Sequence, residues 1–226
     1  MIQIDIDKRI AEVASDYRCL HIECSVENTP TPARLTELLD DECDAIHNTL
    51  QLPDINKRAA IAATRKVYKA LGKDPNRYRP SAEALCRRAV KESGLYTINT
   101  LVDLINLVSI RSGYSIGGFD LDKIEGDGII LGVGEDGEPF EAIGRGQLNI
   151  VGLPVFRDSI GGIGTPTSDN ERTKLSLDTK RLLMTVNIYG EEMSPEDTVA
   201  YIRTLLDQFA DCRDFEYRIV SHASSE

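Results

Sequence analysis

The sequence predicts an α+β fold that all 226 residues form as a single domain. Three observations predict this class. Helical patterns dominate up to Arg111, short strand-like pieces separated by glycines follow Gly113, and a helix and a strand close the chain. Helices and strands that are separated in this way, instead of alternating, are typical of α+β proteins. We expect a helix-rich N-terminal part, residues 1–74, packed on a mixed-strand core, residues 75–226.

The N-terminal half is expected to contain two strands and a series of helices. Ile2–Ile6 alternates between apolar and polar residues, as a half-buried strand does, and Asp7 is placed to cap a helix. Thr31 followed by Pro32 is a typical helix start, because proline fits the first turn without losing a needed donor. The other elements expected here are the strand Cys19–Val26 and the helices Pro32–Leu50, Asn56–Leu71, Ser81–Ser93 and Asn99–Arg111.

Short strands are expected in the C-terminal half. Glu135-Asp136-Gly137 predicts a hairpin turn. Ser194 is placed to cap a helix that runs to about Ala210, and Phe215–Val220 is the last expected strand before a frayed tail, residues 221–226. The other expected strands are Ile129–Val133, Pro139–Ile143, Val151–Phe156 and Leu182–Tyr189.

The net charge of −11 is unevenly distributed. Residues 57–91 hold 11 Lys or Arg and 2 Asp or Glu, a balance of +9, whereas the segments before and after carry −8 and −12. The basic segment is either a solvated helical face or a phosphate-binding patch. The acidic remainder argues against indiscriminate binding of nucleic acids, because it repels phosphates. The residues that we expect to contact RNA are Arg77, Arg79, Arg87, Arg88 and Lys91.

The composition predicts a cytoplasmic protein without a bound metal or cofactor. No apolar run is long enough to span a membrane, and the first residues lack the pattern of a signal peptide. Five cysteines without a regular framework indicate reduced thiols. Cys19, His21 and Cys24 lack the paired knuckles of a zinc site, and no cysteine–histidine pair predicts nucleophilic chemistry.

Two motifs lie close together in the middle of the chain. The first is a Val-Asp-x-x-Asn helix that contains Asp103 and Asn106, and the second, beyond Gly113, is the Phe-Asp-Leu-Asp-Lys segment 119–123. Together they resemble the editing module of the bacterial phenylalanyl-tRNA synthetase beta subunit, over about residues 75–189. The resemblance implies a free-standing, tRNA-binding relative of that module, with glycine loops that line a pocket for a mischarged amino acid and the tRNA 3′ end.

The expected pocket combines polar residues with two glycine clusters. Asp103 and Asn106 are three residues apart, so they share a helix face, and each either ties down a neighbouring loop or contacts a ligand. Gly117-Gly118 and Gly161-Gly162 are either tight turns between strands or places of close approach. The pocket residues that we predict are Asp103, Asn106, Gly117, Gly118, Gly161, Gly162 and Thr185.

The sequence departs from the family at two positions that matter for catalysis. The resemblance aligns a usual histidine with Gly117 and a catalytic glutamate with Thr185. Hydrolysis would therefore need other groups, such as Asp169, Arg172, Thr173 or the terminal adenosine hydroxyl of the tRNA.

Three classes of function stay open from the sequence. The first is a module that binds tRNA or aminoacyl-tRNA and hydrolyses a wrong ester in trans. The second is a non-catalytic module for RNA or for an amino-acid-like small molecule, which the missing histidine and glutamate favour. The third is a protein-interaction scaffold, which the negative charge favours. The sequence leaves open the amino acid, the tRNA and the oligomeric state.

Overall fold

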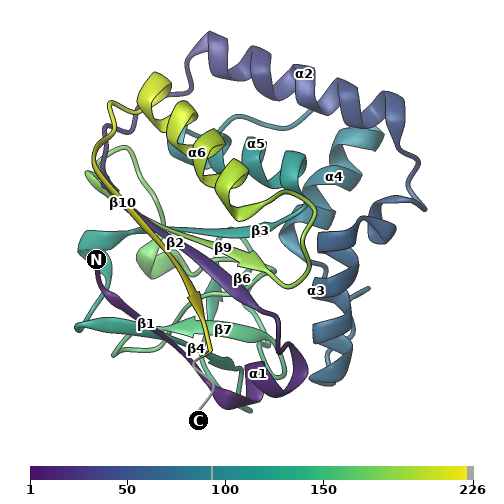
Figure 1. The fold of residues 1–226 in the computed structure, drawn as a ribbon, viewed down its shortest axis with the longest axis vertical. Helices are drawn as coiled ribbons and strands as arrows, with labels where there is room; N and C mark the ends of the chain where they lie inside the picture. Colours follow the sequence, from purple (N-terminus) through teal and green to yellow (C-terminus); the bar gives the residue numbers. More distant parts are fainter. Residues whose placement is uncertain (93, 223–226) are drawn as a thin grey trace.

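The computed structural model describes residues 1–92 and 94–222. Ser93, expected to end a helix, and residues 223–226 of the expected tail lie outside the described residues. The chain forms three layers, namely a layer of helices, a four-stranded central sheet and a second four-stranded sheet (Figure 1). The α+β class that the sequence predicts is confirmed.

The central sheet has the strand order β10-β2-β9-β3, and all neighbours run antiparallel. Its strands are Arg213–Ser221 (β10), Arg18–Ser25 (β2), Arg181–Ile188 (β9) and Ser115–Asp120 (β3). The second sheet has the order β1-β4-β7-β8, with β1 parallel to β4 and the other pairs antiparallel. Its strands are Gln3–Ile6 (β1), Gly128–Val133 (β4), Pro154–Arg157 (β7) and Gly162–Gly164 (β8). Glu141–Ala142 (β5) and Gly146–Gln147 (β6) form a small hairpin.

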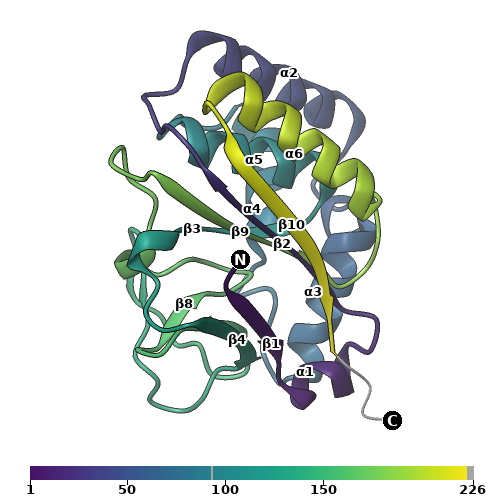
Figure 2. The ribbon, with the colours of Figure 1, turned by 60° about the vertical axis from the view of Figure 1, so that its left-hand side comes forward.

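A layer of helices lies on one face of the central sheet (Figure 2). They are Ala33–Thr49 (α2), Ser81–Glu92 (α4), Thr100–Ser112 (α5) and Pro195–Phe209 (α6). A further helix, Ala59–Ala70 (α3), runs along the side of the molecule, and Lys8–Val13 (α1) follows β1 (Figure 1). Three short 3-10 turns complete the described elements, at Ile55–Lys57, Leu121–Lys123 and Glu171–Thr173. No helix among the described residues has the length and apolar character needed to cross a membrane.

Two apolar cores lie on opposite faces of the central sheet. In β9, Leu182 and Met184 pack into the core beneath the helices, whereas Leu183 packs into the core shared with the second sheet. Successive side chains of a strand point to opposite faces, so β9 is buried on both sides. This burial explains why β9 is almost continuously apolar instead of alternating.

The N-terminal part completes both sheets. β2 pairs with β9 on one side and with β10 on the other, and β1 pairs with β4 of the second sheet. The strand expected at Cys19–Val26 corresponds to β2 and is an interior strand of the central sheet, so residues 1–74 contribute to both sheets.

Of two helix-capping residues predicted from the sequence, one caps its helix in the structure and the other does not. Ser194 caps α6 as expected, since its hydroxyl accepts the backbone N–H of Asp197 at 3.0 Å. Thr31 was expected to cap α2, but Pro32 occupies that position without a side-chain cap. The Thr31 hydroxyl instead donates to the carboxylate of Asp103, because that buried group needs partners.

The glycine pair 117–118 was expected to form a tight turn or to allow close approach, and it lies in the middle of β3, where it allows close approach. A Cβ atom added at Gly118 would overlap the Cδ1 methyl of Ile105, so the glycine allows α5 to pack closely on the strand. The expected strands 139–143 and 151–156 are shorter in the structure, because only β5 and β7 pair there.

Candidate functional site

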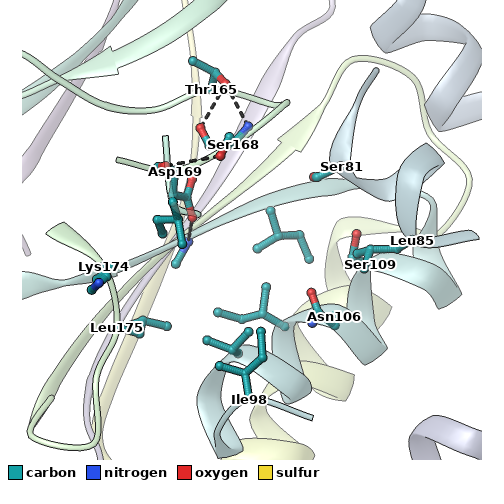
Figure 3. Close-up of a pocket in the computed structure, with 15 residues that line it drawn as sticks. Ser81, Leu85, Ile98, Asn106, Ser109, Thr165, Ser168, Asp169, Lys174 and Leu175 are labelled. Carbon is teal, nitrogen blue, oxygen red and sulfur yellow. Dashed lines mark hydrogen bonds between the residues drawn. The ribbon is translucent and has the colours of Figure 1, made fainter. Parts of the chain in front are cut away.

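A cavity of about 360 Å³ opens between α4, α5, β3 and the segment 165–175 (Figure 3). Its volume falls within the usual range of small-molecule sites. Its walls are mainly apolar, with a few polar side chains. The lining residues are Ser81, Leu85, Ile98, Val102, Ile105, Asn106, Ser109, Ile116, Gly118, Ile143, Thr165, Ser168, Asp169, Lys174 and Leu175.

Regular spacing brings these side chains to one place. Ser81 and Leu85 are four residues apart on α4, so they share a helix face. Asn106 and Ser109 are three apart on α5 and share another face. On β3, the alternation of side chains turns Ile116 and Gly118 towards the helices.

Asp169 is the one carboxylate among the residues that line the cavity. Its Oδ2 atom accepts the backbone N–H of Gly118 at 3.1 Å. Within the described chain, its Oδ1 atom has no hydrogen-bond partner. Gly164 leaves room for that oxygen, since a Cβ atom added there would lie 2.8 Å from Oδ1.

The ionisation of Asp169 is shifted into the neutral range. Burial raises the pKa of Asp169 to about 7, and the hydrogen bond from Gly118 only partly opposes this effect. At neutral pH the carboxyl group is therefore near the midpoint of its titration. Such a group can take up a proton, or it can pair with a cation that enters the cavity.

The opposite wall carries neutral polar groups (Figure 3). Among the described residues, nothing hydrogen-bonds to the side-chain amide of Asn106. The Ser109 hydroxyl donates to the carbonyl of Tyr114 at 2.6 Å and is already occupied as a donor. Lys174 is exposed, and its ammonium group pairs with Glu171. The amide of Asn106 is thus available to a ligand.

Of the predicted pocket residues, Asn106 and Gly118 line the cavity. Asp103 is fully buried and does not line it. Its carboxylate accepts the Thr31 hydroxyl at 2.5 Å and the Ile98 backbone N–H at 2.9 Å. Burial raises the pKa of Asp103, whereas these two hydrogen bonds lower it. Asp103 therefore ties two loops to the start of α5, and one of these loops carries the cavity residue Ile98.

Gly117 and Thr185 are directly opposite each other on β3 and β9. Both belong to the sheet face that carries Phe119 and Leu183, which pack in the core between the sheets. A Cβ atom added at Gly117 would lie 2.6 Å from the Phe119 ring and 2.7 Å from Thr185 Oγ1. The two positions aligned with the family's histidine and glutamate are thus neighbours, but they lie outside the lining of the cavity.

The remaining predicted glycines also lie outside the lining. Gly162 begins β8 in the second sheet, and Gly161 directly precedes it. Arg172 and Thr173, considered as substitutes in catalysis, do not line the cavity either. Arg172 pairs with Asp158 at 2.7 Å, and Thr173 is buried.

The basic residues are divided between two faces of α4. On the face towards α3, the buried carboxylate of Glu83 pairs with Arg65 at 2.7 Å, Arg87 at 2.8 Å and Arg79 at 3.6 Å. Arg79, Glu83 and Arg87 are spaced by four residues, which places them on one side of the helix. Glu83 therefore organises part of the predicted RNA-binding patch.

On the other side of α4, Arg88 follows Leu85 by three residues and shares its face. The Arg88 guanidinium lies 4.8 Å from the centroid of the Tyr96 ring. Tyr96 is 71% exposed, and Ile98, two residues further on, lines the cavity. Of the other predicted contacts, Arg77 stacks near Tyr78 and Lys91 is exposed. Arg88 thus lies on the face of α4 that carries the cavity residue Leu85, whereas Arg79 and Arg87 are gathered around Glu83.

Sequence reasoning missed two groups of this site. Asp169 was considered only as a replacement for the missing catalytic histidine and glutamate. The only sequence feature that could have marked it is its position directly after a Thr-Pro-Thr-Ser run. Glu83 was not singled out, although a lone glutamate four residues from an arginine on either side favours an ion-paired helix face.

Comparison with known proteins connects the chain with one synthetase subunit. The phenylalanine–tRNA ligase beta subunit of Protochlamydia amoebophila (strain UWE25) is 30% identical over 118 residues, which are 51% of this chain and 14% of that protein. A solved N-terminal fragment of the phenylalanyl-tRNA synthetase beta subunit from Pyrococcus horikoshii is also similar. It is 13% identical, the match covers 96% of this chain and 50% of the fragment, and the TM-score is 0.44.

The chain spans about a seventh of the curated relative's length. The profile of the B3/4 domain, which occurs in the phenylalanyl-tRNA synthetase beta subunit, matches residues 63–196. This match covers more than half of the sequence and includes α4, α5, β3 and the segment that carries Asp169. The chain is therefore a member of the B3/4 domain family.

Proposed function

We propose that the chain binds aminoacyl-tRNA, with the aminoacyl group in the cavity and the RNA backbone along the basic segment 57–91. One observation carries the proposal: α4 belongs to both features. Its Ser81 and Leu85 line the cavity, and its arginines belong to the segment with a charge balance of +9. A tRNA 3′ end in the cavity would bring its phosphates alongside this helix.

The charges around Glu83 are suited to phosphate. Three arginines surround one carboxylate, so the cluster keeps a net positive charge of two. Guanidinium groups bind phosphate oxygens through paired hydrogen bonds. Glu83 holds part of each guanidinium in place, which lowers the entropy lost when RNA binds.

Salt dependence of tRNA binding tests this proposal. We expect the dissociation constant to rise steeply between 50 and 200 mM salt, because phosphate contacts release counterions. Arg88→Glu combined with Lys91→Glu should weaken binding by about tenfold or more at low salt. Both side chains are exposed, so the double variant should fold.

The matched control is Arg34→Glu combined with Arg213→Glu, which makes the same change in net charge at exposed positions outside the segment. An equal loss of affinity in both variants would show that only net charge matters. Absence of tRNA binding at low salt would refute the proposal and favour a scaffold for other proteins.

Ester hydrolysis is a second candidate function, and the environment of Asp169 favours it. A carboxylate with a pKa of about 7 suits a general base at neutral pH. It would take a proton from water while the water oxygen attacks the ester carbonyl. The bond to the ribose oxygen would then break, and that oxygen would recover the proton as the tRNA leaves.

Deacylation of correctly and incorrectly charged tRNAs, including Tyr-tRNA(Phe), separates the two functions. If hydrolysis occurs, Asp169→Asn should abolish it, whereas Asp136→Asn, at an exposed turn position, should not. Deacylation that survives in Asp169→Asn would exclude this role for Asp169. Binding of tRNA without deacylation would leave a recognition module.

A further inference from the structure

The cavity presents one carboxylate oxygen without a partner. Asp169 lines a cavity whose other walls are formed mainly by apolar side chains, such as Leu85, Val102, Ile105 and Leu175. An ionised carboxylate is costly in such surroundings unless a partner compensates its charge. The other charged lining residue, Lys174, has its ammonium group at Glu171. A ligand that brings its own positive charge would therefore complete the site, whereas an anionic ligand would be repelled.

The shape of the carboxylate site favours an ammonium group. Gly118 already occupies Oδ2, which leaves a single oxygen, Oδ1, for the ligand. A guanidinium is best bound by both oxygens of a carboxylate, whereas an ammonium is a compact charge that one oxygen can contact. The hydrogen bond from the backbone N–H of Gly118 to Oδ2 keeps the carboxylate oriented while Oδ1 contacts the ammonium.

The rest of the cavity indicates what the ammonium is attached to. The free amide of Asn106 lies on the wall opposite Asp169 and can donate a hydrogen bond to a carbonyl oxygen (Figure 3). Apolar side chains of α5 and Leu175 also line the cavity. A primary ammonium, a nearby carbonyl and an apolar side chain are the parts of an α-aminoacyl group.

We infer that the cavity selects aminoacyl groups with a free α-ammonium, which Asp169 binds, and an apolar side chain, and that it rejects N-acylated ones. This inference rests on the proposed function for the natural ligand, but the recognition needs no RNA. N-acylation removes the charge and adds bulk at the one unpaired carboxylate oxygen. The ammonium would also lower the proton affinity of Asp169, so the inference favours recognition over hydrolysis.

The test compares L-leucinamide with N-acetyl-L-leucinamide by isothermal titration calorimetry. L-leucinamide should bind at least about tenfold more tightly than its N-acetyl form, and about tenfold more tightly than glycinamide, which lacks the apolar side chain. Asp169→Asn should remove the preference for the free amine, because an amide oxygen still accepts from Gly118 but carries no charge. Asp136→Asn should behave as the wild type.

A pH series on the wild-type chain gives a readout that does not depend on any variant. The α-amine stays largely protonated at and below pH 7.5, whereas the Asp169 carboxylate is protonated as the pH falls below about 7. The affinity for L-leucinamide should therefore fall about 20-fold between pH 7.5 and 5.5. Lys174, the other charged group of the lining, forms an ion pair with Glu171.

Three results would overturn the inference: equal binding of both amides, unchanged preference in Asp169→Asn, or tighter binding at pH 5.5. The last would mean that a protonated Asp169 donates to the ligand. The proposed function fails separately. Binding of L-leucinamide without tRNA binding would refute the aminoacyl-tRNA proposal alone, and tRNA binding without a preference for the free amine would refute this inference alone.

Discussion

Replacing Asp169 by asparagine should stabilise the fold at alkaline pH. Burial raises the pKa of Asp169 from its ordinary value of 3.8 to about 7, so the folded chain binds its proton more tightly than the unfolded chain does. As the pH rises from about 4 to 7, ionisation stabilises the unfolded chain first, and the free energy of unfolding falls. Asparagine does not ionise and avoids this loss.

The size of the effect follows from the two pKa values. Each pKa unit corresponds to about 1.4 kcal/mol, which gives a cost of about 1.7 kcal/mol at pH 5 and about 4 kcal/mol at pH 8. Partial exposure of Asp169 reduces both figures. We expect the stability of Asp169→Asn relative to wild type to increase by about 2 kcal/mol between pH 5 and pH 8.

Urea denaturation of both proteins at the two pH values measures this difference. Asp136→Asn serves as the control, because its exposed carboxylate should give the same difference at pH 5 and pH 8. A constant difference for Asp169→Asn, or a relative destabilisation at pH 8, would refute the assignment of a buried carboxyl group with a raised pKa. The fall in affinity for L-leucinamide expected between pH 7.5 and 5.5 would then lose its basis as well.

Three further substitutions test the framework of the site. Asp103→Ala removes the acceptor of two hydrogen bonds and should lower the free energy of unfolding by about 3 kcal/mol; an unchanged denaturation midpoint would contradict this. Gly117→His would collide with the Phe119 ring, so we expect a loss of about 2 kcal/mol or more and no gain in deacylation; a stable, active variant would disprove this. Glu83→Gln leaves three arginines without their buried counter-charge and should cost about 3 kcal/mol, measured as a lower melting temperature; no change would show that the arginines do not need the carboxylate.

Most elements could be predicted from local patterns, because capping residues and periodicity act over a few neighbours. The helix that follows Ser194 and the nearly continuous apolar strand β9 are examples. β3 was missed because Gly117-Gly118 favours a turn by local rules. The strand requires glycine because of packing: Gly118 lies against Ile105 on α5, and Gly117 lies against Thr185 on β9. Both contacts are tertiary.

The site was predictable only where a motif marked it. Asn106 and Gly118 belong to the resembling segments and line the cavity. The raised pKa of Asp169 arises from its burial in the folded chain, and no window of sequence contains that environment. The orientation of the Asp103 side chain also depends on a tertiary contact, because its hydrogen-bond donor Thr31 lies 72 residues away in the sequence.

The interior position of β2 in the central sheet limits which truncated fragments of this chain can keep the sheet intact. A fragment restricted to the family match, residues 63–196, would lose β1, β2 and β10 together with almost all of α6. β9 would then have an unpaired edge and uncovered apolar faces, which is a typical template for aggregation. The family match is thus shorter than the segment that pairs β9 on both sides, so binding experiments should use a chain that includes the strands from both ends.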